Sequence, residues 1–166
     1  MCIRDRYYIP EGNTSPINQD LDLTYSKHFV LGYSHQLNKN FGIKAEAYYQ
    51  DLTGIPIEMD SSAFSLTNAG SGFARVFPNA LNNNGTGYNY GIELTVQRYF
   101  NKNWHALFSG CLYNSQYTPS DGIERNTSFN GIYAANFLAG REFEVGKNKV
   151  LGLGVKVTGA GGKRKG

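Results

Sequence analysis

The chain alternates large apolar residues with small or polar ones at a period of two, and this alternation constrains its fold more than any other feature. In residues 43–50, for example, one side of the pattern is Ile43, Ala45, Ala47 and Tyr49. Successive side chains of a β-strand point to opposite faces of its sheet, whereas a helix repeats every 3.6 residues. The pattern predicts six strands, at residues 29–37, 43–50, 88–97, 104–117, 133–142 and 151–158.

Short and long connections alternate between these strands. Residues 38–40, 101–103 and 146–149 are short segments of Asn, Lys and Gly, of the kind that close β-hairpins. Residues 52–87 and 118–130 are much longer and link one hairpin to the next. In an up-and-down antiparallel sheet every second connection lies at the same end, so short turns and long loops separate. This asymmetry is typical of outer-membrane β-barrels, which have short periplasmic turns and long extracellular loops.

The two faces of the predicted sheet differ in chemistry. One face is apolar and uncharged through the middle of each strand, as a lipid-facing surface requires. The other suits a water-filled lumen and carries Lys44, Glu46, Glu93, Gln97, Asn136, Glu142 and Lys156. Aromatic residues gather near strand ends, as at a membrane interface; they are Tyr48, Tyr49, Tyr88, Tyr90, Tyr99, Phe100, Trp104, Tyr113, Tyr117 and Phe143. We predict an all-β, antiparallel up-and-down transmembrane β-barrel segment, with a soluble β-sandwich as the alternative.

Composition excludes several other classes of protein. No segment approaches the ~20 consecutive apolar residues that a membrane-spanning helix needs. Aromatic residues make up 14% of the chain, whereas disordered chains are poor in them. The formal net charge of +3 comes partly from Arg4, Arg6 and residues 163–165 at the two ends, so it indicates no nucleic-acid partner. Two cysteines, Cys2 and Cys111, are too few for a framework of disulfides.

Several stretches, in order along the chain, carry a family resemblance. They are HFVLGY at 28–33, KAEAYYQDL at 44–52 followed by Ile55-Pro56, NYGIELT at 89–95, RNTSFNG at 125–131, LAGREF at 138–143 and GGKR at 161–164. Together they resemble the C-terminal barrel of TonB-dependent outer-membrane receptors, most closely the Bacteroidetes type with a carboxypeptidase-regulatory-like domain at the N-terminus. The resemblance implies about six strands of a 22-stranded barrel. It also implies the TonB energy-transducing complex as a partner, through a plug domain and TonB box that this chain lacks.

The resemblance also divides the chain into two parts. Residues 1–6 resemble a translated sequencing adapter and are expected to be non-native. Residues 7–166 are expected to be a partial receptor barrel without its plug domain and terminal strand. Six strands cannot close a barrel when the smallest bacterial ones use eight, and an open edge in lipid leaves backbone polar groups unpaired. We therefore expect the chain to be a fragment.

The sequence contains no catalytic or metal-binding pattern. His28, His35 and His105 are dispersed, and neither they nor Cys111 has a ligand-type partner at metal-site spacing. Ser109 lies four residues from His105, or ~13 Å along a strand, too far for a nucleophile and its base. We therefore predict a protein that is not an enzyme and that uses no cofactor or metal.

The predicted long loop, Thr53 to Thr86, holds the only candidate ligand-binding residues. Phe64, Phe73, Arg75 and Phe77 lie there among Ser, Asn and Gly. Loops longer than ~12–15 residues are usually functional or disordered. Three aromatic rings and one guanidinium could bind a sugar, peptide or chelate, or dock a surface lipoprotein. Alternatively, they only pack the loop over the barrel mouth.

The function that these observations predict is transport across a bacterial outer membrane. The chain would supply wall and extracellular loops to a TonB-dependent receptor that takes up a nutrient, with outer-membrane lipid around it. Two other classes stay open: a passive porin-like or small structural outer-membrane barrel, and a secreted β-sandwich binding module. The substrate does not follow from the sequence.

Overall fold

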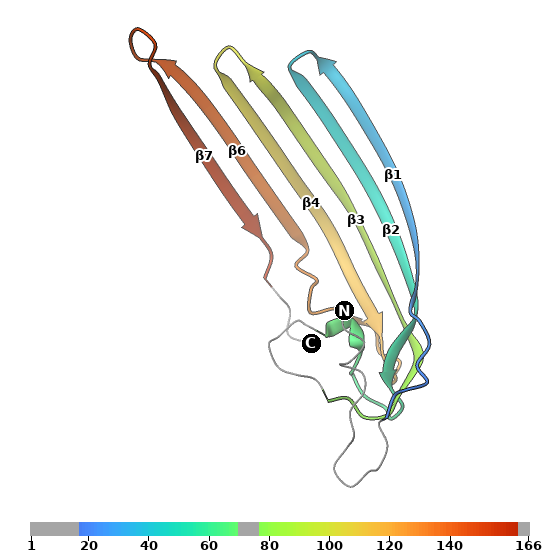
Figure 1. Ribbon diagram of the computed structural model, residues 1–166. Helices are drawn as coiled ribbons and strands as arrows, with labels where there is room; N and C mark the ends of the chain where they lie inside the picture. Colours follow the sequence, from blue (N-terminus) through green and yellow to red (C-terminus); the bar gives the residue numbers. More distant parts are fainter. Residues whose placement is uncertain (1–16, 70–76, 163–166) are drawn as a thin grey trace.

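The computed structural model describes residues 17–69 and 77–162, which form one antiparallel β-sheet (Figure 1). Its elements are β1 (Tyr25–Asn38), β2 (Phe41–Glu58), the short 3-10 helix η2 (Leu66–Asn68), β3 (Leu81–Asn101), β4 (Trp104–Thr118), β5 (Arg125–Asn126), β6 (Tyr133–Glu144) and β7 (Val150–Ala160). The strand order is β1-β2-β3-β4-β6-β7, and β5 pairs with β4. The six predicted strands and their up-and-down antiparallel order are confirmed.

The sheet is open and does not close into a barrel. Within the described part of the chain, β1 and β7 each have a neighbour on one side only. Each edge therefore presents a row of backbone N–H and C=O groups to whatever lies beside it. What the structure bears out is an all-β antiparallel meander, and closing it would need strands that pair with both edges.

Tight turns join β1 to β2, β3 to β4 and β6 to β7, and Figure 1 shows all three at one end of the sheet. We call this the turn end. Between β3 and β4 the turn consists of Lys102 and Asn103, with φ of 51° and 64°. Positive φ at both central residues is a requirement of the type I′ turn, whose twist matches that of the flanking strands. The long connections lie at the opposite end, the loop end, so the predicted separation of short and long connections is confirmed.

The predicted loop of residues 52–87 is wrong at both of its ends. β2 and β3 continue as a pair up to Glu58 and Leu81, so only residues 59–80 leave the sheet. Ile55 and Ile57 are each 3% exposed. A Cβ atom on Gly85 would lie 2.5 Å from Ile57 Cγ2, so glycine lets the two strands approach here. The register shifts on both sides of Ile55 break the simple alternation that marks the other strands.

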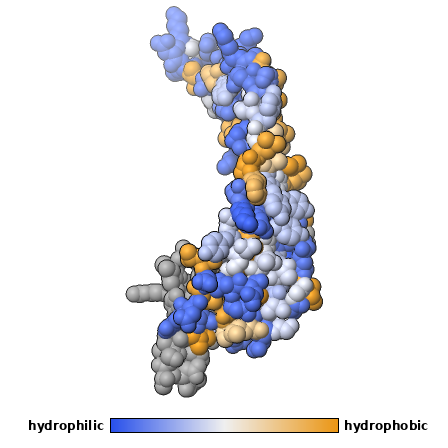
Figure 2. Space-filling model, turned by 90° about the vertical axis from the view of Figure 1, so that its right-hand side faces the viewer, coloured by the Kyte–Doolittle hydropathy of each residue, from blue (hydrophilic) through white to orange (hydrophobic). Residues whose placement is uncertain are grey.

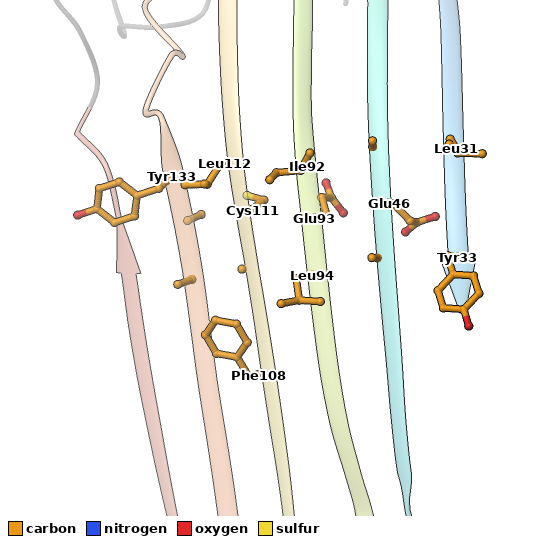
Figure 3. Close-up of a pocket in the computed structure, with 15 residues that line it drawn as sticks. Leu31, Tyr33, Glu46, Ile92, Glu93, Leu94, Phe108, Cys111, Leu112 and Tyr133 are labelled. Carbon is orange, nitrogen blue, oxygen red and sulfur yellow. The ribbon is translucent and has the colours of Figure 1, made fainter. Parts of the chain in front are cut away.

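The strand register brings the apolar positions of neighbouring strands into continuous rows. In one row Leu31 pairs with Ala47, Ala47 with Ile92, Ile92 with Leu112, and Leu112 with Tyr133. Figure 3 shows the labelled members of this row at one level across the sheet. The predicted apolar face is therefore continuous across β1, β2, β3, β4 and β6.

The polar positions form matching rows on the other face. Lys44 pairs with Thr95, Thr95 with Ser109, and Ser109 with Asn136. Gln97 and Lys156 fall in another such row, through Leu107 and Leu138. The predicted division of the sheet into an apolar and a polar face is thus confirmed.

Burial is concentrated at the loop end. The buried hydrophobic residues of the described chain are Ile55, Ile57, Leu81 and Tyr117. Along the rest of the strands the large hydrophobic side chains are exposed, Leu31 to 79% and Ile92 to 57%. Figure 2 shows a thin, curved slab with hydrophilic side chains at its tip and hydrophobic ones exposed along its middle. None of the helices formed by residues 17–69 and 77–162 is long and apolar enough to cross a membrane.

Candidate functional site

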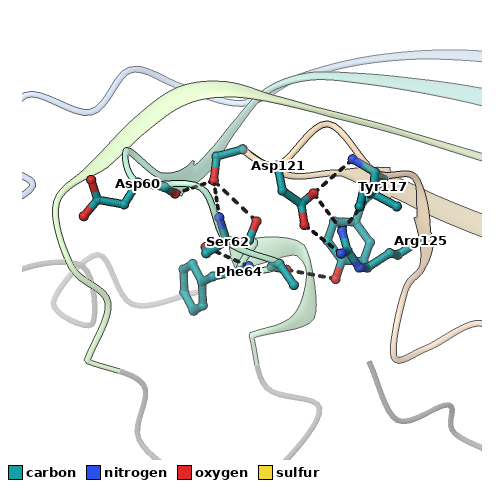
Figure 4. A network of polar contacts seen from close by, with 9 residues as sticks. Asp60, Ser62, Phe64, Tyr117, Asp121 and Arg125 are labelled. Atoms are coloured by element: carbon teal, nitrogen blue, oxygen red, sulfur yellow. Dashed lines mark hydrogen bonds and ion pairs between the residues drawn. The ribbon is translucent and has the colours of Figure 1, made fainter.

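The loop end carries a network of polar contacts that joins the connection after β2 to the connection after β4 (Figure 4). We call this network the loop latch; its side chains and backbone groups come from Asp60, Ser62, Ala63, Tyr117, Ser120, Asp121 and Arg125. The two connections are far apart in sequence, with Ser62 and Ser120 separated by 58 residues. The latch is therefore a tertiary feature that neither loop forms alone.

Tyr117 is the buried centre of the loop latch. It lies at the end of β4, is 2% exposed, and its hydroxyl donates a hydrogen bond to the Ala63 carbonyl at 3.0 Å. The sequence predicts Tyr117 to be one of the aromatic side chains at a membrane interface. For this residue the prediction is wrong, because the loop after β2 covers its ring. A buried tyrosine of this kind needs a hydrogen-bond partner, and the Ala63 carbonyl supplies it.

Ser120 links the two connections through a single hydroxyl group. The Ser62 N–H donates to Ser120 Oγ at 3.0 Å, and Ser120 Oγ donates to the Asp60 carbonyl at 2.6 Å. One hydroxyl thus acts as acceptor and donor to the same backbone segment, which is within the bonding capacity of serine. Phe64 follows directly, with its N–H donating to Ser62 Oγ at 3.1 Å.

Asp121 and Arg125 form an ion pair within the connection after β4. Both guanidinium nitrogens donate to the carboxylate, Nη1 to Oδ1 at 2.8 Å and Nη2 to Oδ2 at 2.6 Å. The Arg125 hydrogen bonds, with a further one from the Ile123 N–H, hold the pKa of the Asp121 carboxyl below its usual range. The hydrogen bonds to Asp121 also raise the pKa of Arg125. Since Asp121 is 16% exposed, this bidentate pair orders the turn that contains Gly122, whose φ is 73°.

A second set of contacts holds the rest of this connection against β4. Thr127, 1% exposed, donates from its N–H to the Ser115 carbonyl and from its hydroxyl to Ser115 Oγ. The Ser128 N–H donates to Asn68 Oδ1 at 2.9 Å, which connects this segment to η2. Residues 118–130 therefore connect β4 to β6, as predicted, and within this connection β5 adds a short pairing with β4.

The structure describes two of the four predicted ligand-binding residues. Phe64 is half-buried beside the loop latch, and Phe77 is 59% exposed near the other end of the same connection. Phe73 and Arg75 lie outside the described residues. The structure therefore does not test the prediction that the four side chains form one ligand-binding group.

The polar face carries ordered side-chain contacts. Asn89 donates to Gln50 Oε1 at 2.7 Å, and Gln50 donates to Ser26 Oγ at 2.8 Å, so three strands are joined in one chain of hydrogen bonds. Lys44 Nζ lies 2.6 Å from Glu46 Oε2. These side chains give the face a wettable surface with both signs of charge.

A shallow hollow of about 760 Å³ lies on the sheet near the level of the Leu31 row (Figure 3). It is lined by small residues such as Ala47, Gly110 and Ala135 and by larger ones such as Leu94 and Phe108. Its lining is almost entirely apolar, so it could make apolar contacts with a ligand but offers few groups for hydrogen bonds. Elsewhere, the described residues contain no group of three or more His, Cys, Asp or Glu side chains that could hold a metal ion.

Sequence reasoning missed the loop latch, although part of its signal is visible. Asp121 and Gly122 form a common turn pair, and Arg125 follows four residues after the aspartate. The partners of Tyr117 and Ser120 carry no comparable signal, because backbone groups of residues 60–63 supply them.

Comparison of the chain with protein-family models, curated proteins and solved structures finds no match.

Proposed function

We infer that this chain forms part of the wall of an outer-membrane β-barrel, and that the barrel is a TonB-dependent receptor for nutrient uptake. In this arrangement the apolar face contacts lipid, the polar face lines the lumen, the turn end faces the periplasm and the loop end faces outward. The loop latch orders the outer mouth of the wall. The TonB complex would act on a plug domain supplied elsewhere in the receptor.

The continuous apolar face is the observation that carries this proposal. Its rows of Leu, Ile, Val, Phe and Ala run across the sheet, yet the side chains are exposed. Soluble monomers rarely expose apolar patches of more than a few hundred Å². Lipid is a medium in which such a face is stable without a protein partner, and β-sheet walls in membranes alternate apolar and polar residues in this way.

The alternatives predict different surroundings for the same sheet. A β-sandwich needs a second sheet over the apolar face, whereas the described strands all belong to one sheet. A porin or small structural barrel uses the same wall but has no plug and no need of TonB. The receptor is favoured over the porin by the family resemblance alone.

Cysteine labelling tests the placement of the two faces. With Cys2 and Cys111 replaced by Ser, the matched variants Glu93→Cys and Leu94→Cys place one thiol on each face of β3, one residue apart. In lipid vesicles we expect a water-soluble maleimide to label position 93 and to leave position 94 unlabelled until detergent is added. Equal labelling of both positions in vesicles would contradict the membrane wall.

Uptake by the complete receptor tests the second part of the proposal. The full-length reading frame is recovered from the same DNA source and expressed in an outer-membrane host with and without TonB. We expect a plug domain and TonB box upstream of residue 7, and nutrient uptake that stops when TonB is removed. Uptake that is unchanged without TonB would instead indicate a passive porin.

A further inference from the structure

Two arginines lie on the apolar face of the sheet near the turn end. Arg98 on β3 shares its face with Val96, because alternate residues of a strand point the same way. Arg141 on β6 pairs directly with Trp104 on β4, and its face is that of Ala139. The neighbouring positions of this face near the turn end are apolar, so a cation is unexpected there and these two side chains need a partner of their own.

Both guanidinium groups are held against aromatic rings. Arg98 Cζ lies 3.9 Å from the centre of the Trp104 ring, and Arg141 Cζ lies 5.0 Å from the centre of the Phe143 ring. A stacked guanidinium uses its flat face for the ring and keeps its N–H groups, which lie in the plane, available for an anion. The rings therefore orient the two guanidinium groups without supplying acceptors for their N–H groups.

Neither arginine has an acidic partner among the residues that the structure describes. The ion pairs found there join Lys44 to Glu46 and Asp121 to Arg125. Arg98 Nε is also buried and has no hydrogen-bond partner within the same ranges. On β6 the carboxylates next to Arg141 belong to residues of the opposite, polar face. The charge of these two arginines, near the turn end of the apolar face, is thus positive and uncompensated by the described residues.

A groove runs from Arg141 along the apolar face, and Trp104, on which Arg98 stacks, also lines it. Its volume is about 450 Å³, and it is lined by Trp104, Ala139, Gly140, Arg141, Leu153, Gly154 and Val155. Arg141 pairs with Leu153, and Ala139 pairs with Val155. The groove therefore has its basic part toward the turn end and its aliphatic part toward the middle of the strands. That order matches an amphiphile with an anionic head and an apolar tail.

We propose that Arg98, Trp104 and Arg141 form a binding site for the headgroup phosphate of an anionic phospholipid, with an acyl chain lying along Leu153 and Val155. The phosphate oxygens accept charge-assisted hydrogen bonds from the guanidinium groups, for which Arg is better suited than Lys. This inference rests on the proposed function, since it places the lipid in the leaflet at the turn end. To the proposed membrane wall the inference adds the class of lipid that is bound and the place on the wall where it binds.

Trp104 is the one tryptophan of the chain, which makes it a built-in reporter. The chain is transferred from urea into phosphatidylcholine vesicles that contain a small, equal fraction of either brominated phosphatidylglycerol or brominated phosphatidylcholine. Bromine quenches tryptophan fluorescence on contact. We expect brominated phosphatidylglycerol to quench Trp104 more strongly, with an apparent preference of about five-fold for each arginine, since a basic side chain near an anionic lipid surface contributes about that much.

Matched variants separate the site from general charge attraction. Arg98→Gln and Arg141→Gln are each expected to lower the preference for brominated phosphatidylglycerol by about five-fold, and the double variant should lose it. Lys102→Gln and Lys147→Gln remove the same charge from turns at the same end, and both should keep it. Arg98→Lys keeps the charge but loses the planar donor edge, so it should keep only part of the preference. Circular dichroism of each variant in vesicles confirms that the β content is unchanged.

The outcomes distinguish this proposal from the proposed function. Quenching of Trp104 by both brominated lipids to the same extent would leave the membrane wall intact and overturn the phosphate site. Equal loss of preference in the Lys102 and Lys147 variants would also overturn it. No quenching by either lipid, from a chain whose circular dichroism shows the β content of the folded sheet, would contradict the membrane placement itself.

Discussion

Replacing Tyr117 by Phe tests whether the loop latch holds the two long connections together. The substitution removes one hydroxyl from a side chain that is 2% exposed and keeps the ring that fills the space under the loop. The hydrogen bond to the Ala63 carbonyl, 3.0 Å long, is lost, and the carbonyl is left without that donor. We therefore expect the loop after β2 to open more often, while the sheet itself stays folded.

The size of this effect follows from the net value of one hydrogen bond. An intramolecular hydrogen bond between uncharged groups contributes about 0.5–1.5 kcal/mol to stability. In a local opening equilibrium this corresponds to a roughly two- to ten-fold larger open fraction, since about 1.4 kcal/mol is a factor of ten. Tyr117→Ala removes the ring as well, and loss of a buried aromatic side chain costs about 3–5 kcal/mol.

Amide hydrogen exchange measured by mass spectrometry reads out this opening. Peptides that cover residues 59–69 should exchange roughly two- to ten-fold faster in Tyr117→Phe, and peptides from the middle of β3 should not change. Tyr33→Phe is the matched control, because Tyr33 is 65% exposed on the apolar face, where its hydroxyl supports no loop. If Tyr117→Phe leaves exchange in residues 59–69 unchanged, the latch does not hold that loop and the reasoning is wrong.

Three further predictions concern other contacts. The pKa of Asp121 is lowered in the folded chain, so its ion pair stabilises the turn fully above about pH 4, the ordinary pKa range of the carboxyl. This stabilisation is lost as the pH falls through the lowered pKa. Hydrogen exchange in residues 119–126 should therefore rise only in that acid range, and in Asp121→Asn it should be high at all pH values. Gly85→Ala places a methyl group 2.6 Å from a backbone oxygen of β2, so it should lower the free energy of unfolding, measured with denaturant, by about 1–3 kcal/mol. Gly152 has open space around it, so Gly152→Ala should lower this free energy by less than half as much. Asn103→Val forces a β-branched residue to a φ of 64° and should destabilise the β3–β4 hairpin by about 1–2 kcal/mol, whereas Asn103→Gly should fold as well as the native chain.

The strands and their faces could be predicted because each rests on a local pattern. Residues 43–50 reveal a strand by alternation alone. Lys102 and Asn103 reveal a hairpin turn, since Asn adopts the positive φ that such a turn requires more readily than most residues. The same reasoning failed at residues 53–58 and 81–86. There the strand pairing depends on a close approach between Ile57 and Gly85, with register shifts that disrupt the period of two.

The candidate site could be predicted only in part, for a related reason. The aromatic residues and the arginine of the long loop are visible in the sequence, but the partners that order the loop end are mostly backbone groups. Any residue supplies a carbonyl like that of Ala63, so its pairing with Tyr117 leaves no trace in the residue types. The same holds for Arg98 and Trp104, whose stacking depends on how β3 and β4 are aligned.

By itself, the sequence determined an all-β antiparallel chain with one apolar face, one polar face, and short turns opposite long loops. These properties follow from a period of two and from turn chemistry, both of which act between residues close together along the chain. Only the tertiary structure decided where Tyr117 is buried, how far β2 and β3 extend, and that Arg98 and Arg141 flank Trp104. These features depend on the register between strands, and register places residues side by side that are remote in sequence.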